Sequence, residues 1–474
     1  MSRGNGLSDA YTETLVRLKG QKGNKAEIGL KVLMWVLYSE RPLRAEELCH
    51  ALSVEMGSLD LDPENIPVLR TLLSSCLGLV TVEASSSTVR LVHFTLQEHP
   101  LSSSTLFRGP HTTIAEVCLT YLNFRCIRDL QLDDFWSAPS TMPFLEYASL
   151  YWGKRARMGM TENVKILALK LLGGFDEHVS AQLPLLGHNE NREDWDPDFD
   201  STEGPTGFTA LHAASFLGIV EIVAIVLEKK EWDANATDCL DRTALKWAAR
   251  NGHEEVVKML LEREEINPDQ ADDWISRTPI SYAAEKGHSG IVKMLLEREE
   301  VNPDRADTDY GETPISWAAL SGHEGIVKML LEREEVNPDR AETRFGQTPL
   351  SLAAEGGHEG VVKMLLQREE VNPGQADRSG QTPISQAAER GHEGVVKMLL
   401  EREEVNLDRA DRYGQRPISL AVAKGHGGIV KMLLERHEVN PNQSVTDIRG
   451  TPPPLAARPS NSAATIIPLK RKRQ

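Results

Sequence analysis

The sequence has no run of about 18 consecutive apolar residues, so it offers no conventional membrane-spanning helix. Its first residues, MSRGNGLSDAYTETL, lack the apolar core of a secretory signal peptide. The five cysteines are odd in number, lie far apart and form no CxxC pair. We therefore expect reduced, mostly buried thiols in a cytoplasmic protein, with the nucleus as the second compartment to consider.

Basic residues are outnumbered, 53 against 70 acidic ones, which gives a formal net charge of -17. Such a surface repels phosphate backbones, so nucleic acid is not an expected partner. The sequence also lacks GxxxxGK[ST], GxSxG, HExxH and a GxGxxG that follows a strand. We therefore expect no enzymatic activity, no cofactor, no metal site and no membrane partner.

Aromatic residues make up only 5% of the chain, which predicts interiors built from aliphatic side chains.

The second half of the sequence consists of internal repeats. The segment TPISYAAEKGHSGIVKMLLEREEVNPDRAD begins at Thr278, and an incomplete eighth start lies at Thr451. The starts of the seven units lie 34 or 35 residues apart, at Thr209, Thr243, Thr278, Thr313, Thr348, Thr382 and Arg416. A fixed period of this length indicates a stacked repeat architecture.

Each unit predicts two short helices joined by a turn. Thr278 is suited to cap the first helix and Pro279 to occupy its first position. Gly287 ends that helix, residues 291–296 supply the apolar face of the second, and Asn302-Pro303 breaks it. The segment that precedes the next Thr is expected to project as an extended β-turn, which we call a finger.

These residues resemble the ankyrin repeat, whose T-P-L-H-x-A-A-x-x-G-H pattern is closest at Thr209-Ala210-Leu211-His212. The resemblance covers roughly residues 205–455 and implies an α-solenoid that binds proteins. Serine replaces the histidine of the family, which we expect to remove one link between the turn and the helix, at Ser281, Ser316, Ser351, Ser385 and Ser419.

Positions that hold the fold recur from unit to unit, whereas positions that bind a partner are free to vary. Two such sets are aromatic: four residues after a start lie Trp247, Tyr282 and Trp317, and near the finger tips lie Trp274, Tyr310, Phe345 and Tyr413. Exposed aromatic residues are typical interface anchors, so we predict that these seven bind a partner. The alternative is that they pack against the neighbouring unit or finger.

One histidine also recurs in each unit, at His253, His288, His323, His358, His392 and His426. Stacked helices would separate them by roughly 10 Å, too far for one metal coordination sphere, so we predict a structural capping role. The recurring LEREE runs are interpreted as solvated helix ends, with an acidic docking stripe as the alternative.

The first half predicts a short helix over residues 9–20 and then helices over 26–38, 44–54 and 63–76. The β-branched runs 79–82 and 88–94 follow, joined by Glu83-Ala84-Ser85-Ser86-Ser87 as a hairpin. Three helices and a hairpin are the order of a winged helix. The third helix carries one Arg against one Glu and the wing is rich in serine, so we predict domain packing instead of DNA reading.

VLMWVLYSERPLRAEELCHAL and VRLVHFTLQEHPL resemble the winged-helix module that follows the NACHT NTPase in fungal NACHT–ankyrin proteins, a module named after GPI inositol-deacylase. Residues 143–153 resemble the helical segment downstream of it. The resemblance covers roughly residues 20–170 and implies an arm of a signalling NTPase without its P-loop. A gene-model fragment, a truncated paralogue and a separate adaptor all fit.

We therefore predict a mainly α protein, with a winged-helix and helical N-terminal region followed by an ankyrin-repeat α-solenoid. Its expected parts are an N-terminal segment (1–24), a winged-helix-like domain (25–105), a helical region (106–186), an acidic linker (187–207), ankyrin repeats (208–455) and a basic tail (456–474). The predicted function is a non-catalytic scaffold or recognition arm for a protein partner in NACHT-type signalling. The alternative is a nuclear winged-helix transcriptional regulator, imported through Lys470, Arg471, Lys472 and Arg473.

Overall fold

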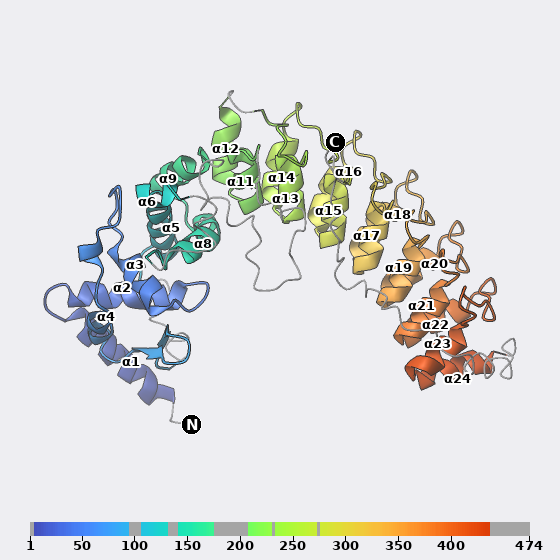
Figure 1. The fold of residues 1–474 in the computed structure, drawn as a ribbon, viewed down its shortest axis with the longest axis horizontal. Helices are drawn as coiled ribbons and strands as arrows, with labels where there is room; N and C mark the ends of the chain where they lie inside the picture. The colour runs from blue at the N-terminus through green and yellow to red at the C-terminus, as the bar shows by residue number, and fades with distance from the viewer. Residues whose placement is uncertain are drawn as a thin grey trace, which may run out of the picture. The chain divides into compact units, whose positions relative to one another are not determined.

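The computed structural model describes residues 4–93, 106–130, 141–174, 207–229, 233–272 and 275–436, with backbone alone for residues 4–10. The chain divides into two compact units, Met1–Trp232 and Asp233–Gln474 (Figure 1). Within the described residues, no helix is both long and apolar enough to span a membrane.

The first unit begins with a helical cluster and a hairpin. Its elements are α1 (Gly4–Lys19), α2 (Lys25–Tyr38), α3 (Ala45–Ser53), η1 (Pro63–Asn65), α4 (Leu69–Ser75), β1 (Val80–Glu83) and β2 (Thr88–Leu91). The strands are antiparallel, with Val80 opposite Leu91, and the chain before α3 extends the sheet through Val89 N–H, which donates to Leu43 O at 2.8 Å. This is the predicted order of three helices and a wing.

The predicted helix over 63–76 is wrong in its first half. Proline at position 67 has no N–H to donate, and it holds the preceding Ile66 in an extended conformation with ψ 113°. The segment therefore forms the single turn η1, and α4 starts only at Leu69.

Helix α2 is the centre of this cluster and contacts α1, α3, α4, β2 and α5 (Pro110–Leu122). Its Trp35 is fully buried and meets the rings of Phe144 and Tyr147 edge-on, with centroids 5.6 and 6.0 Å away. Gly29 lets α4 approach, because a Cβ there would lie 2.5 Å from Ser75 O. The apolar run of α2 thus ties the winged-helix part to the helices that follow.

Those helices are α6 (Arg125–Arg128), α8 (Leu145–Met158) and α9 (Glu162–Leu172), with α5 packed on α8 and α9. The first repeat, α11 (Ala210–Leu217) and α12 (Val220–Glu228), belongs to the same unit and packs on α9. At Gly153 of α8 a Cβ would lie 2.9 Å from Leu217 Cδ2. The apolar face that the first repeat would otherwise expose is therefore covered by α8 and α9.

All but the last residue of the predicted linker 187–207 lies outside the described residues.

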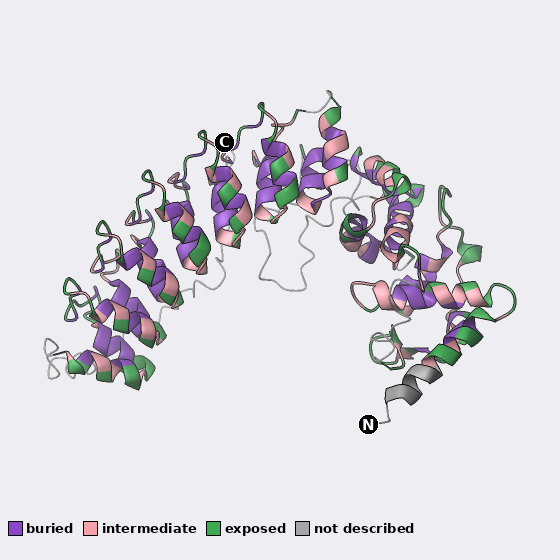
Figure 2. Ribbon diagram, turned by 180° about the vertical axis from the view of Figure 1, so that it is seen from behind, coloured by how far each residue is buried: buried purple, intermediate pink, exposed green. Residues whose placement is uncertain are grey.

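The described residues of the second unit form six helix pairs, repeats 2 to 7. Their first helices are α13 (Ala244–Arg250), α15 (Pro279–Lys286), α17 (Pro314–Ser321), α19 (Pro349–Gly356), α21 (Pro383–Arg390) and α23 (Pro417–Lys424). Their second helices are α14 (Glu254–Leu261), α16 (Ser289–Leu296), α18 (Glu324–Leu331), α20 (Glu359–Leu366), α22 (Glu393–Leu400) and α24 (Gly427–Glu435). Figure 2 shows buried residues where these helices meet and exposed residues along the fingers.

The first helices have a shared local chemistry. Threonine caps most of them, as where Thr313 Oγ1 accepts the N–H of Ser316 at 3.4 Å, and proline occupies the first turn from α15 onward. His212 makes two contacts with its threonine, because its Nδ1 accepts the N–H of Thr209 at 3.1 Å and lies 2.8 Å from Thr209 Oγ1. The serines in place of histidine keep only the second contact, as expected: Ser316 Oγ lies 3.0 Å from Thr313 Oγ1, and the same pair recurs at Ser281, Ser351 and Ser385. Ser419 is the exception, because Arg416 stands where the threonine would be and the Oγ has no hydrogen-bond partner within the described residues.

The recurring histidines connect consecutive repeats. The Nε2–H of His323 donates to Glu285 O at 2.9 Å, and that of His358 donates to Leu320 O at 3.0 Å. His288, His392 and His426 make the same bond to the preceding first helix. Each imidazole therefore satisfies a carbonyl at the end of a helix 37 or 38 residues earlier, which is the structural role expected of them.

The imidazole lies directly over the glycine that ends the preceding first helix. At Gly322, where φ is 75°, a Cβ would lie 2.4 Å from His358 Nδ1. This glycine is required both by its left-handed backbone and by the ring above it.

We expect Gly322→Ala to destabilise the array by about 2–4 kcal/mol, because it strains the backbone and displaces a ring that carries a hydrogen bond. Urea denaturation followed by circular dichroism measures the change. Gly427→Ala is the matched control, since a Cβ there meets nothing within 4 Å, and it should shift stability by no more than about 1 kcal/mol. Equal effects of the two substitutions would contradict this role of the imidazole.

Candidate partner-binding surface

The fingers present the most varied residues of the array, and we number each after the repeat that it precedes. Fingers 4 to 7 comprise residues 302–312, 337–347, 372–381 and 406–415. Each turns at a glycine with positive φ, such as Gly346 at 77° and Gly414 at 77°. The tips of these fingers are the surfaces that a partner would meet first.

An acidic side chain closes each of these turns from inside. Asp307 Oδ1 accepts the N–H groups of Tyr310 and Gly311 at 3.0 and 2.9 Å. Equivalent bonds are made by Glu342, Asp377 and Asp411. The carboxylates are thus occupied by the backbone of their own finger and point away from solvent.

Neighbouring tips are hydrogen-bonded to one another through their backbones. Thr343 N–H donates to Tyr310 O at 2.5 Å, Arg378 N–H to Phe345 O at 2.7 Å, and Arg412 N–H to Ser379 O at 2.9 Å. The tips therefore form one continuous edge instead of independent loops. This edge could not be predicted from the sequence, because no side-chain pattern encodes a backbone bond between residues 33 positions apart.

Three of the predicted anchors lie on this edge. The side chains of Phe345 and Tyr413 are 43% and 56% exposed, and Tyr310 is half-buried. The rings of Tyr310 and Phe345 lie nearly parallel with centroids 6.4 Å apart, and the Arg344 guanidinium lies 4.7 Å from the first and 5.3 Å from the second. Arg412 covers Tyr413 in the same way at 5.1 Å. Trp274 lies outside the described residues.

The other three candidates occupy the bases of the fingers. Trp247 and Tyr282 are each 3% exposed, so these rings have almost no surface to offer a partner, and Trp317 is half-buried. Each donates to the acid of the finger beside it: Trp247 Nε1 to Asp238 at 3.2 Å, Tyr282 Oη to Asp272 at 3.3 Å and Trp317 Nε1 to Asp307 at 3.2 Å. They hold finger and helix together, which is the packing role that the sequence left open as the alternative.

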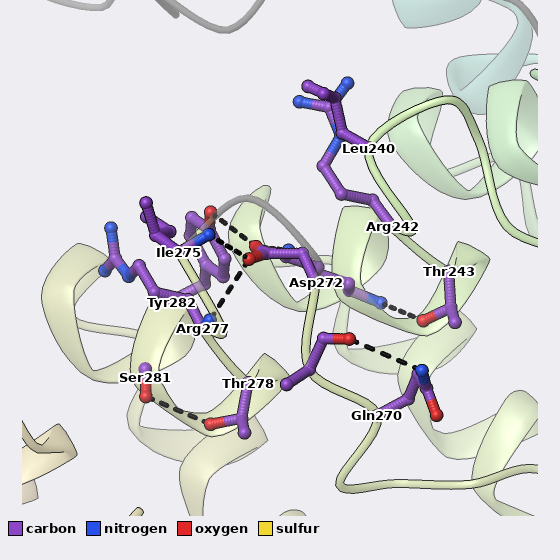
Figure 3. A network of polar contacts seen from close by, with 12 residues as sticks. Leu240, Arg242, Thr243, Gln270, Asp272, Ile275, Arg277, Thr278, Ser281 and Tyr282 are labelled. Carbon is purple, nitrogen blue, oxygen red and sulfur yellow. Dashed lines mark hydrogen bonds and ion pairs between the residues drawn. The ribbon is translucent and has the colours of Figure 1, made fainter. Parts of the chain in front are cut away.

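Buried cations separate these aromatic rings. The Arg277 guanidinium lies between Tyr282 and Trp317, 4.1 and 4.0 Å from their ring centroids. Figure 3 shows Asp272 in the same finger as Arg277, where it accepts the N–H groups of Ile275 and Arg277 and the hydroxyl of Tyr282. Such stacked cation–π contacts stiffen the bases of the fingers. Sequence reasoning missed them, although the Arg directly before Thr278 was a usable signal.

In repeats 3, 5 and 6 the residue before the Thr also reaches the first helix that follows. Arg277 Nη2 donates to Glu285 at 2.5 Å, and Gln347 and Gln381 donate to Glu355 and Glu389 at 3.1 and 3.3 Å. Repeat 4 breaks this pattern.

Here Glu312 faces a helix that carries Leu320 in place of the acceptor. Glu312 is 7% exposed, and its Oε2 has no hydrogen-bond partner within the described residues. The pKa of Glu312 is raised to about 8, chiefly by burial and also by the charges of Asp307 and Glu342, while Arg277 acts in the opposite direction. Glu312 is therefore a destabilising position within the stack.

The comparisons with known proteins agree with this architecture. A family model described as ankyrin repeats (3 copies) matches residues 156–272, 264–342, 280–375, 326–409 and 350–445, together more than half of the chain. A second, described as the GPI inositol-deacylase winged helix domain, matches residues 13–106. Both matches confirm the predicted fold class and the predicted winged helix. No curated protein matches the chain.

Among solved structures, the chain is similar to the human ASB11 ankyrin repeat domain, at 23% identity and a TM-score of 0.42. The match covers 48% of this chain and 98% of that domain.

We expect Glu312→Gln to stabilise the protein. The folded-state pKa of Glu312 is raised above its ordinary value of 4.5, so the native protein loses stability as the pH rises towards and through about 8. The variant should remove that loss and be more stable by about 2–4 kcal/mol at pH 9, with a smaller gain near pH 5. Thermal unfolding from pH 5 to pH 9 measures this. Glu334→Gln, at an exposed position of the same repeat, is the control and should leave the pH profile of the parent unchanged.

Proposed function

The chain belongs to the ankyrin-repeat family, and from this premise we propose that it is a non-catalytic recognition arm that captures protein partners along its finger tips. Ankyrin repeats are a protein–protein interaction module, and the fold is generally non-catalytic. The proposal assigns the contact energy to Tyr310, Phe345 and Tyr413, with Trp274, which lies outside the described residues, as a fourth anchor predicted from the sequence.

The observation that carries the proposal is the exposed aromatic row on an edge joined by backbone hydrogen bonds. Large rings on a rigid support lose little conformational entropy when a partner binds. Helix-facing positions contribute less, because Trp247 and Tyr282 are buried.

The winged helix supports a signalling context. A winged-helix domain followed by ankyrin repeats is the order seen in the fungal NACHT–ankyrin proteins that the sequence resembles, so we propose that this arm works beside a NACHT-type NTPase in the cytoplasm. Within η1 and α4 the charged residues are Glu64 and Arg70, and Arg90 beside the wing is paired with Glu83 at 3.1 Å. A DNA-reading helix would carry exposed cations there, so these residues favour packing over the nuclear regulator. The basic run 470–473 lies outside the described residues.

Simultaneous alanine substitution of Trp274, Tyr310, Phe345 and Tyr413 should reduce partner capture at least 10-fold, since anchor truncations cost about 1–4 kcal/mol each. The measurement is quantitative mass spectrometry of proteins retained by the tagged full chain from cells of its source. A control with alanine at Met158 and Ile166, which are 56% and 63% exposed in the first unit, removes similar apolar surface and should retain the same proteins. Unchanged retention by the fourfold variant, with its helical content intact, would refute the finger assignment.

A further inference from the structure

The tips of fingers 5 to 7 carry exposed positive charge, although the chain as a whole is acidic. Each carries one exposed arginine, Arg344, Arg378 or Arg412, at its outermost turn. One acid of each of these fingers, Glu342, Asp377 or Asp411, is turned inward onto backbone N–H groups. Asp408 of finger 7 is exposed and pairs with Arg416 at 3.5 Å. A chain with a net charge of -17 thus presents a row of positive charge along this part of the finger edge.

These three arginines differ from two arginines that lie earlier in fingers 4 and 5. Arg305 and Arg340 are paired with the acids of the preceding repeat, Asp269 and Asp304, each at 3.0 Å. Within the described residues, by contrast, the three tip arginines form no ion pair. Arg344 and Arg412 lie over the exposed rings of Phe345 and Tyr413, which hold their guanidinium groups at the surface. The row is therefore a set of positioned cations, of which Arg344 also interacts electrostatically with Asp309 at the tip of finger 4.

The spacing of the row suits an extended peptide. The backbone bonds Arg378 N–H to Phe345 O and Arg412 N–H to Ser379 O fix the three tips in register. Neighbouring repeats stack about 10 Å apart, the width of a helix. A polyproline II segment rises about 3.1 Å per residue with three residues per turn, so every third side chain of a bound segment lies on one face and reaches the next finger.

We propose that the tips of fingers 5 to 7 bind an extended acidic segment of a partner protein, with carboxylates at every third position paired to Arg344, Arg378 and Arg412. Apolar residues between those carboxylates pack on Phe345 and Tyr413. Carboxylates suit the row because guanidinium binds them through two parallel hydrogen bonds. The inference rests on the proposed function and specifies the chemistry of its partner.

A nucleic acid fits the same edge less well. The second helices of these repeats end in exposed acids such as Glu334, Glu335, Glu369 and Glu370. A long polyanion that extends beyond the three tips would be repelled by the acidic array, whereas a segment of about eight residues touches the tips alone.

The test is a selection of random 12-residue peptides, displayed on phage, against the purified full chain at physiological salt. We expect enrichment of peptides with Asp or Glu at positions i, i+3 and i+6. A fluorescent peptide made from the enriched sequence should bind at least 10-fold more weakly when Arg344, Arg378 and Arg412 are all replaced by Glu. Arg378→Glu alone should select peptides with Lys or Arg at the central position.

The matched control is Lys363→Glu, the same charge reversal at an exposed position of α20, and it should leave peptide affinity unchanged. Enrichment of neutral or basic peptides would overturn the inference, as would acidic peptides insensitive to the triple reversal. So would a 20-nucleotide single-stranded RNA that binds the tips more tightly than the peptide.

The selection also separates this inference from the proposed function. Enriched peptides that lose binding with Phe345→Ala and Tyr413→Ala but carry no acidic pattern would preserve finger-tip recognition and refute the acidic partner. Peptides that depend on neither the rings nor the arginines would refute both.

Discussion

The second unit depends on the contact that five of its recurring histidines, His288, His323, His358, His392 and His426, make with the repeat before them. One imidazole covers a left-handed glycine turn and donates to the last carbonyls of the helix that this turn ends. A short helix of eight residues is marginal in water by itself, so it persists because its end is satisfied and its face is covered by a neighbour. Cohesion of the array is therefore a property of consecutive pairs of repeats.

The fingers at the surface are also held together by contacts between consecutive repeats. Their acids face inward to hold the turns, and their backbones bond to one another, so an edge without regular secondary structure becomes rigid. At the bases, Arg277 lies between two aromatic rings and joins one repeat to the next. A rigid edge with exposed rings and cations loses little entropy when it binds, which is why the fingers are suited to recognition.

Glu312 shows that near-identical repeats are not interchangeable. Its neighbours pair with an acid on the following helix, but Leu320 removes that group in repeat 4 and leaves a buried carboxyl. One substitution in a recurring position therefore creates a buried carboxyl with a raised pKa, and with it a local pH dependence of stability. The effect of a substitution between repeats on stability therefore depends both on the substituted residue and on the residue that it contacts.

The sequence by itself determined the repeats, their boundaries at Thr and Gly, and the structural use of the histidines, because these depend on local chemistry that recurs every 34 or 35 residues. It also determined the wing, through two β-branched runs beside each other in the chain. It did not decide which aromatic residues are exposed: Trp247 and Tyr413 look alike in a pattern, and only packing buries one and leaves 56% of the other accessible. Three features came from tertiary structure alone, because each depends on groups that lie about a full repeat apart. They are the backbone bonds between finger tips, the arginine between two rings, and the row of tip arginines that form no ion pair within the described residues.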